Sequence, residues 1–322
     1  DVTFPHAAIE DFVVVKSSGH PLFVLANLVD DIDMGITHVI RGEDLLPSTP
    51  KALLLWHALQ GADAPPPAFA HLPMLVNEKR QKLSKRRDPV AVEFYRDEGY
   101  LPEAMRNYLA LLGWSHPQGE EIIPLDELVA QFRLEDVNHS PAFFDVQKLR
   151  HVNAEYLRAM PVGEFVVTAQ PWLAPPRAPW HEDQFDPGAF AKLAPLVQER
   201  VSVLGEIPRM VDFIFLAEPV VDDKSWRDAT KDPEAAATVL GGALKAFGAV
   251  AWSAAELHAA TLAVAEQAGL KLNKAQAPIR VAVTGRSVGP PLFESLEVLG
   301  RDRAVARIEA ALARLDHPSP PE

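Results

Sequence analysis

A basic stretch at residues 79–87 carries the side chains with the clearest capacity for chemistry. Six of its nine residues are lysine or arginine, in a chain whose formal net charge is −13. Ser84 stands next to Lys85, and Lys82 lies two residues before it. Because ammonium groups, a hydroxyl and free backbone N–H groups can converge on one anion, the stretch could hold several phosphate oxygens. A solvent-exposed basic turn is the alternative interpretation, since runs of like charge are commonly solvated.

Two further candidate groups are associated with apolar runs. Arg41 comes directly after residues 37–40, and His71 lies within residues 69–76, followed by Leu72 and Pro73. If both runs are strands of one open parallel sheet, these side chains lie near the edge where such sheets bind ligands. Each signal is weak alone, because an arginine also serves in structural ion pairs and a histidine at a strand end is often packed.

The acidic residues 30–35 do not fit a calcium-binding loop. With Gly35 at the required sixth position, the third position is Ile32, and the twelfth is Arg41 where a glutamate is needed. We expect a solvated acidic helix end there. The chain has no cysteine and no His-x-x-x-His or Glu-x-x-His spacing, so we expect no zinc or other metal site. It also lacks the common glycine-rich nucleotide-binding motifs, so a nucleotide must be bound by a different structural motif.

The composition is that of a globular protein of two or three domains. The 322 residues are 48% hydrophobic and 23% charged. No apolar run approaches the roughly 20 residues that span a bilayer, so we expect no membrane contact and a cytoplasmic location. The excess of acidic over basic residues argues against general nucleic-acid binding but allows a local basic patch that contacts a nucleic acid. The first residues contain neither an initiator methionine nor a signal peptide, so we expect a piece of a longer chain.

The first part of the chain alternates between strand and helix patterns. Strands are predicted at residues 11–16, 37–40 and 69–76. Residues 21–31 fit either a strand or a helix. A helix is predicted at residues 51–60, started by Ser48, Thr49 and Pro50 with a hydroxyl cap. Because its apolar residues lie nearly all round, we expect burial on more than one face. The alternation is typical of one half of an open parallel sheet.

The rest of the chain is predominantly helical. Helices are predicted at residues 90–98, 102–112, 125–132, 145–150, 232–247 and 253–268. From residue 151 onward no strand–helix alternation is present. Residues 278–300 are predicted to form an apolar strand, a Gly/Pro turn and a helix. The expected fold class is therefore α/β followed by all-α.

The segment Lys82-Leu83-Ser84-Lys85-Arg86 resembles the Lys-Met-Ser-Lys-Ser signature of class I aminoacyl-tRNA synthetases, in the form common for glutamate enzymes. The segments that follow the family closely are residues 25–31, 34–44, 48–50, 95–104, 107–114, 281–285 and 289–300. On these residues the chain is identified as a member of the bacterial-type glutamyl-tRNA synthetase family. The resemblance is strongest over residues 11–150 and loosest over residues 160–275.

The resemblance implies a specific domain order. Residues 1–78 would form the second half of a Rossmann-like catalytic domain. Residues 79–150 would hold the Lys-Leu-Ser-Lys loop and a fold that contacts the tRNA stem. Two α-helical anticodon-binding domains would follow at residues 151–215 and 216–316, with a tail at residues 317–322.

The resemblance also implies a reaction, its substrates and the residues that serve it. The family ligates L-glutamate to tRNA(Glu) through glutamyl-adenylate, with ATP and Mg²⁺ as substrate; tRNA(Gln) is a second candidate, and we expect a monomer. The expected catalytic residues are Lys82, Ser84 and Lys85. The ATP site is expected at Glu43, Asp44, His71, Leu72, Pro73, Lys82, Leu83, Ser84, Lys85 and Arg86. The glutamate site is expected at Phe23, Asn27 and Arg41.

Two departures from the family pattern matter. Phe23 stands where many relatives have a tyrosine whose hydroxyl touches the substrate. A hydrogen bond to a charged group contributes about 1.5–3 kcal/mol, so we expect weaker glutamate binding. The His-x-Gly-His signature of the class occurs nowhere in residues 1–322. We therefore expect this chain alone to be unable to form glutamyl-adenylate.

Two alternative functions stay open. A non-catalytic tRNA-binding paralogue would keep the scaffold but would not need the Lys-Leu-Ser-Lys loop, and the sequence upstream would discriminate. A glutamine-specific synthetase would have β-barrels in place of the helical region after residue 150. Anticodon contacts are expected within residues 192–209 and 272–293.

Overall fold

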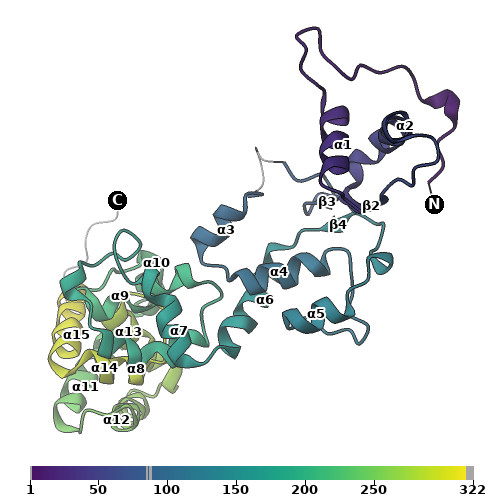
Figure 1. The fold of residues 1–322 in the computed structure, drawn as a ribbon. Coiled ribbons are helices and arrows are strands. Elements are labelled where there is room, and N and C mark those ends of the chain that lie inside the picture. The colour runs from purple at the N-terminus through teal and green to yellow at the C-terminus, as the bar shows by residue number, and fades with distance from the viewer. Residues whose placement is uncertain (1, 85, 87–88, 317–322) are drawn as a thin grey trace. The chain divides into compact units, whose positions relative to one another are not determined.

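The computed structural model describes residues 2–84, 86 and 89–316, which form two compact units (Figure 1). Unit 1 is Asp1–Ala91 with Met105–Leu149, and unit 2 is Val92–Ala104 with Arg150–Glu322. The predicted tail at residues 317–322 lies outside the described residues. The finer domain limits at residues 78, 150 and 215 stay a prediction.

Unit 1 contains a short parallel pair of strands. β1 (His38–Gly42) pairs with β2 (Ala68–Leu72), and the register sets Arg41 opposite His71. Parallel strands need a crossover connection, and here it contains α2 (Thr49–Gln60), which packs against α1 (Phe23–Asp33). The strand–helix–strand prediction is confirmed, and residues 21–31, which fitted either element, are mostly helix.

Residues 69–76 do not form the single strand predicted for them. β2 ends at Leu72, and β3 (Leu75–Val76) pairs in parallel with β4 (Ala142–Phe143) in a second sheet. Pro73 lies between the two strands and has no N–H to donate to a ladder, which favours the break.

The strand predicted at residues 11–16 is also wrong. Only Val15 has a strand-type partner, in an isolated antiparallel bridge with Pro21. The tight turn between them is formed as its glycine suggests, because Gly19 has a φ of 82° and the Lys16 N–H donates to the His20 carbonyl at 2.9 Å. Two residues on each side of such a turn are too few to build a ladder.

α2 begins where the sequence predicts, but its environment differs. Pro50 lies in the first turn, whereas no side-chain hydroxyl caps the helix; the Ser48 hydroxyl donates to the Leu45 carbonyl instead. The expected burial on more than one face is wrong, because Leu54 is 39% and Leu59 is 51% exposed. α2 packs against α1 and against the adjoining 3-10 helix at residues 43–48, which leaves these leucines exposed.

The remaining part of unit 1 packs around buried polar groups. Asn107 accepts from the Ile123 N–H at 2.8 Å and donates to the Glu121 carbonyl at 2.9 Å, and the Tyr108 hydroxyl accepts from the Asp145 N–H at 2.7 Å. These contacts fix the loops between the predicted helices, which are confirmed. The elements are η1 (His6–Ala8), η2 (Glu43–Ser48), α4 (Pro102–Leu111), α5 (Leu125–Gln131), η3 (Leu134–Asp136) and α6 (Val146–Ala159), of which α4 and α6 run across the unit boundary.

Unit 2 is helical throughout its described residues, as predicted for the chain after residue 150. Its elements are α3 (Val92–Glu98), α7 (Val162–Ala169), η4 (Gln170–Trp172), η5 (Glu182–Gln184), α8 (Pro187–Gln198), η6 (Leu204–Glu206), α9 (Ile207–Phe215), α10 (Asp223–Ala229), α11 (Pro233–Ala249), α12 (Ala254–Gln267), α13 (Leu272–Thr284), α14 (Leu292–Leu299) and α15 (Arg301–Asp316). Side chains of Asp186, Asp222, Asp232 and Ser253 accept from backbone N–H groups and start four of these helices. Within the described part of the chain, no helix is both long and apolar enough to cross a membrane.

The strand predicted after residue 278 is wrong, because α13 runs through that segment. Its run of apolar residues looks like a strand, yet Ala275, Ile279 and Val283 recur every four residues and are fully buried. This helical face packs among α11, α12 and α15. α13 ends at Gly285, whose φ of 76° and close approach to the Val220 carbonyl leave no room for a Cβ atom.

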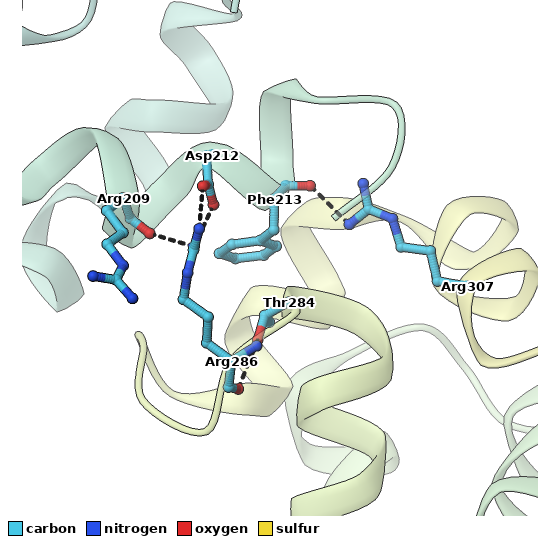
Figure 2. Close-up of polar contacts among 6 residues, drawn as sticks. All are labelled: Arg209, Asp212, Phe213, Thr284, Arg286 and Arg307. Carbon is cyan, nitrogen blue, oxygen red and sulfur yellow. Dashed lines mark hydrogen bonds and ion pairs between the residues drawn. The ribbon is translucent and has the colours of Figure 1, made fainter. Parts of the chain in front are cut away.

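Arg307 on α15 ties the ends of two helices together. Its guanidinium donates to the Phe213, Leu216 and Ala217 carbonyls at the end of α9 and to the Val283 carbonyl near the end of α13, over 2.8–3.0 Å. Figure 2 shows the bond to Phe213. A cation is favoured there because helix C-termini carry unpaired carbonyls and negative partial charge. Burial, with Arg303 as a second cause, lowers the pKa of Arg307 to about 10, so the side chain stays charged at neutral pH.

We predict that Arg307→Met lowers the free energy of unfolding by about 2–4 kcal/mol, because the substitution leaves buried carbonyls without donors. Urea denaturation followed by far-UV circular dichroism measures the change. Arg314→Met is the matched control on the same helix. Its guanidinium lies 4.5 Å from the Trp226 ring and 3.9 Å from Asp223 and is partly exposed, so we expect a loss below about 1 kcal/mol. Equal losses in the two variants would contradict the helix-end role of Arg307.

Candidate active site and tRNA-binding cleft

Phe23, Asn27 and Arg41, the three residues predicted for the glutamate site, line one cleft in unit 1. Phe23 and Asn27 lie one helical turn apart on α1, and Arg41 lies near the carboxyl end of β1. The complete lining is Phe23, Val24, Asn27, Leu28, Asp31, Arg41, Ser48, Ala52 and Phe69. Phe23 is 58% exposed, so its ring is accessible from solvent. Their binding of glutamate stays a prediction.

Arg41 is held on three sides. Its Nη2 donates to the Thr49 hydroxyl at 2.9 Å, and its Nε donates to His71 Nε2 at 3.4 Å. The Thr49 hydroxyl is in turn 3.0 Å from His71 Nε2. The guanidinium carbon lies 5.5 Å from the centre of the Phe69 ring, a cation–π contact. The strand register and the first residue of α2 thus bring together side chains that are up to 30 positions apart.

Burial and charge act together on the pKa of His71 and oppose each other on the pKa values of Arg41 and Asp31. Burial, reinforced by the Arg41 charge, lowers the pKa of His71, so the imidazole is neutral at pH 7. Burial also lowers the pKa of Arg41, and the nearby Asp31 carboxylate offsets part of that effect. For Asp31, burial raises the pKa although Arg41 opposes it. The cleft therefore contains a permanent cation, Arg41, and a carboxylate, Asp31, whose burial disfavours its charged form.

Asp31 also orients Asn27. The Asn27 amide Nδ2 donates to Asp31 Oδ2 at 2.8 Å, one turn along α1. Asp31 lies in residues 30–35, where the sequence predicts a solvated acidic helix end, yet it is half-buried. Sequence reasoning missed Asp31 as a site residue; the only available signal was its spacing of four residues from Asn27.

Of the residues predicted for the ATP site, Glu43, Asp44 and Lys82 make hydrogen bonds elsewhere in unit 1, whereas His71 belongs to the Arg41 cluster. Glu43 Oε1 accepts from the Met74 backbone N–H at 3.1 Å, which holds the chain just after Pro73 beside η2. Asp44 Oδ2 accepts from Lys82 Nζ at 3.0 Å. The lysine hydrogen bond is the main cause that lowers the pKa of Asp44. Leu72 ends β2 and is partly exposed.

A tight hairpin turn positions Lys82 and Leu83. The Asn77 N–H donates to the Gln81 carbonyl at 2.9 Å, and the Asn77 side chain accepts from the Lys79 and Gln81 N–H groups at 3.0 and 3.1 Å. Arg80 takes a φ of 58° inside this turn. The Leu83 N–H then donates to the Leu75 carbonyl at 3.1 Å. The basic stretch is therefore partly anchored to β3 by backbone hydrogen bonds, unlike a free solvated turn.

The end of the Lys-Leu-Ser-Lys-Arg segment is described only in part. The Ser84 hydroxyl accepts from the Arg86 N–H at 3.3 Å, which turns the backbone just after the serine. Lys85, predicted to be catalytic, lies outside the described residues. Over the ranges that the structure describes, no group of three or more His, Cys, Asp or Glu side chains could hold a metal ion.

Unit 2 has an open cleft of about 410 Å³ that draws on both segments predicted to contact an anticodon. Glu206 and Arg209 come from the first segment, and Arg286 and Val288 come from the second. Arg286 donates to both oxygens of the buried Asp212 at 2.6 and 2.7 Å and to the Arg209 carbonyl at 2.7 Å (Figure 2). The Arg209 guanidinium makes no hydrogen bond with any residue that the structure describes. The cleft thus presents one fixed and one available cation.

Comparisons with known proteins agree with this two-part architecture. A family model described as "tRNA synthetases class I (E and Q), catalytic domain" matches residues 1–151, and one described as "Anticodon binding domain" matches residues 164–312. The chain therefore represents a class of protein in which a class I synthetase catalytic region is followed by a helical anticodon-binding region.

Individual relatives narrow the class. The chain is 57% identical to a glutamate–tRNA ligase of Frankia alni over 312 residues, covering 97% of this chain and 66% of that protein. It is 57% identical to the glutamate–tRNA ligase of Salinispora arenicola, covering 97% of this chain and 67% of that protein. The chain belongs to the glutamate–tRNA ligase family, and it spans about two thirds of the length of these relatives.

A solved structure supports the same assignment. A glutamate tRNA ligase from Elizabethkingia meningosepticum, solved in complex with its amino acid, superimposes with a TM-score of 0.75 at 30% sequence identity. The match covers 96% of this chain and 63% of that one.

We predict that Lys82→Met raises the pKa of Asp44 toward the ordinary value of about 3.9, because the variant removes the main group that favours the charged carboxylate. Carboxyl-carbon NMR titration of the labelled chain measures it. Lys79→Met, in the same hairpin turn, is the control and should leave the Asp44 titration unchanged. An Asp44 titration that Lys82→Met leaves unchanged would contradict the Asp44–Lys82 contact.

Proposed function

We propose that the protein carrying this chain ligates L-glutamate to tRNA(Glu) with consumption of ATP. The observation that carries the proposal is the placement, within unit 1, of the Arg41 cleft and of the hairpin that presents Lys82 to Asp44. The high identity to glutamate–tRNA ligases supports it.

The chemistry has two steps. In the first, a carboxylate oxygen of glutamate attacks the α-phosphorus of ATP, the bond to pyrophosphate breaks, and glutamyl-adenylate forms. In the second, a hydroxyl of the terminal tRNA ribose attacks the activated carbonyl, and AMP leaves with the electron pair of the broken bond. Both steps depend mainly on positioning and on stabilising charge that develops on phosphate oxygens.

Lys82, Ser84 and Lys85 supply this stabilisation in our proposal. The exposed Lys82 ammonium is paired with Asp44, a contact that is weak enough at the surface for a polyphosphate to replace. The hairpin fixes the backbone next to the lysine, so little ordering is needed when ATP binds. Mg²⁺ arrives with the nucleotide, because it keeps several waters and is bound largely through substrate phosphates.

Arg41 and Asn27 select glutamate in our proposal. An arginine guanidinium can bind a carboxylate through two parallel hydrogen bonds, and the Asn27 amide, oriented by Asp31, offers a further polar contact. Glu43, His71, Leu72 and Pro73 would lie against ATP.

Unit 2 contributes tRNA recognition. Arg209 and Arg286 line one cleft, as a surface that meets an anticodon phosphate or base requires. A monomeric state and a cytoplasmic location belong to the same proposal, and tRNA(Gln) stays a second candidate substrate beside tRNA(Glu).

We predict that the complete enzyme, with a His-x-Gly-His half joined to these residues, exchanges pyrophosphate into ATP when glutamate and tRNA(Glu) are present. Lys82→Met should slow this exchange roughly 100- to 1000-fold, as for the loss of one transition-state contact. Lys79→Met serves as the charge-matched control, with an expected effect below about threefold.

Residues 1–322 alone should show no exchange. Exchange by this chain alone, or a fully active Lys82→Met enzyme, would overturn the assignment. Intact tRNA binding with no exchange in the complete wild type would favour the non-catalytic paralogue.

Phe23→Tyr should lower the KM for glutamate in the same exchange assay. A new hydroxyl at the edge of the cleft could donate to the charged substrate, and such a bond is equivalent to roughly a tenfold gain in affinity. Phe69→Tyr is the comparison, since Phe69 also lines the cleft but stacks on Arg41. An unchanged or higher KM for Phe23→Tyr would show that a hydroxyl at position 23 has no substrate partner.

A further inference from the structure

Arg41 has more hydrogen-bond donors than its neighbours use. A guanidinium carries five N–H bonds: one on Nε and two on each Nη. The Nε–H points to His71 and one Nη2–H points to Thr49. No described residue contacts Nη1. Three N–H bonds therefore remain: one Nη1–H and the second Nη2–H form the end edge of the guanidinium, and the other Nη1–H points back toward Cδ; Arg41 lines the cleft.

The contacts on the opposite edge define the protonation of His71. Arg41 Nε always carries a proton, so His71 Nε2, at 3.4 Å, must accept. The Thr49 hydroxyl accepts from Arg41 Nη2 at 2.9 Å and lies 3.0 Å from the same imidazole nitrogen, so with Nε2 unprotonated its own O–H is placed to donate to Nε2, whose one lone pair the two donors then share. His71 is then neutral, with its proton on Nδ1. The lowered pKa of His71 agrees with this tautomer.

Thr49 is available for this role because it does not cap its helix. It is the first residue of α2, it is 7% exposed, and no side-chain cap bond is formed at that end. The Phe69 ring, 5.5 Å from the guanidinium carbon, limits rotation out of the plane of these contacts. Three elements of unit 1, namely β1, β2 and α2, thus fix the position of the Arg41 guanidinium and its roll, which is the rotation of its plane about the side-chain axis.

We propose that Thr49 and a neutral, Nδ1-protonated His71 are positioning residues that hold the Nη1/Nη2 edge of Arg41 toward a carboxylate ligand in the cleft. The inference rests on the proposed function for the identity of that ligand, glutamate. A guanidinium held in advance loses less rotamer freedom when the carboxylate binds, and two parallel hydrogen bonds require a defined roll angle.

The first test needs no activity. Long-range ¹⁵N–¹H NMR of the ¹⁵N-histidine-labelled chain, with His71 assigned through a His71→Gln variant, reports which ring nitrogen carries the proton. We expect the Nδ1–H tautomer at neutral pH. An Nε2–H tautomer or a doubly protonated ring would overturn the proposal.

The second test uses the complete enzyme and two variants at Thr49. Thr49→Val keeps the shape of the side chain and removes the hydroxyl, whereas Thr49→Ser keeps the hydroxyl. With saturating tRNA(Glu), we expect Thr49→Val to raise the KM for glutamate roughly tenfold and to leave the KM for ATP unchanged. Thr49→Ser should stay within about threefold of the wild type.

The two hypotheses fail in different ways. A wild-type enzyme without glutamate-dependent exchange would refute the proposed function. An active wild type, with Arg41→Lys impaired for glutamate but Thr49→Val unimpaired, would refute the positioning role alone. Equal losses in Thr49→Val and Thr49→Ser would also refute it, because both would then reflect packing. If Thr49→Val fails to fold, the histidine tautomer decides.

Discussion

The parallel register of β1 and β2 is the constraint on which the candidate active site depends. It sets Arg41 opposite His71 on one face, and the crossover between the strands returns the chain so that Thr49, at the start of α2, reaches both. A shift of one residue would turn one of the paired side chains to the other face of the sheet, because successive side chains in a strand alternate. The two strands share only five register pairs, so a small backbone element determines where the cation of the cleft lies.

Four basic side chains of the described residues are bound in three distinct ways, and each way corresponds to a different role. Arg307 is buried and bound by helix-end carbonyls, which makes it a structural cation. Arg286 is paired through two hydrogen bonds with the buried Asp212, which fixes the loop after α13. Lys82 has one exposed carboxylate partner, and three N–H donors of Arg41 are unused by the residues that the structure describes. Groups with unused or replaceable partners are the ones suited to bind an anionic ligand, since buried and fully bonded groups must first lose their contacts.

Sequence reasoning reached the family, the order of fold classes and most helices because these depend on local patterns and on short motifs. It placed Phe23, Asn27 and Arg41 in one site by resemblance, and the structure brings them to one cleft. It failed where a pattern has two physical solutions: the apolar run after Pro278 packs as a helix, and the run after Phe69 is broken at Pro73. Thr49 could not be found as a partner of Arg41, because a hydroxyl before a proline is the ordinary signal of a helix cap and only the tertiary fold redirects it.

The transfer of glutamate to tRNA that we propose for this scaffold is measured most directly by charging of tRNA. The complete enzyme would be incubated with ATP, radiolabelled glutamate and a tRNA(Glu) transcript, and acid-precipitable label would be counted, with tRNA(Gln) and radiolabelled glutamine in parallel reactions. We expect glutamyl-tRNA(Glu) to form and no glutamine to be attached to either tRNA. An enzyme that binds tRNA(Glu) without transferring glutamate, or one that transfers glutamine, would contradict the proposed function.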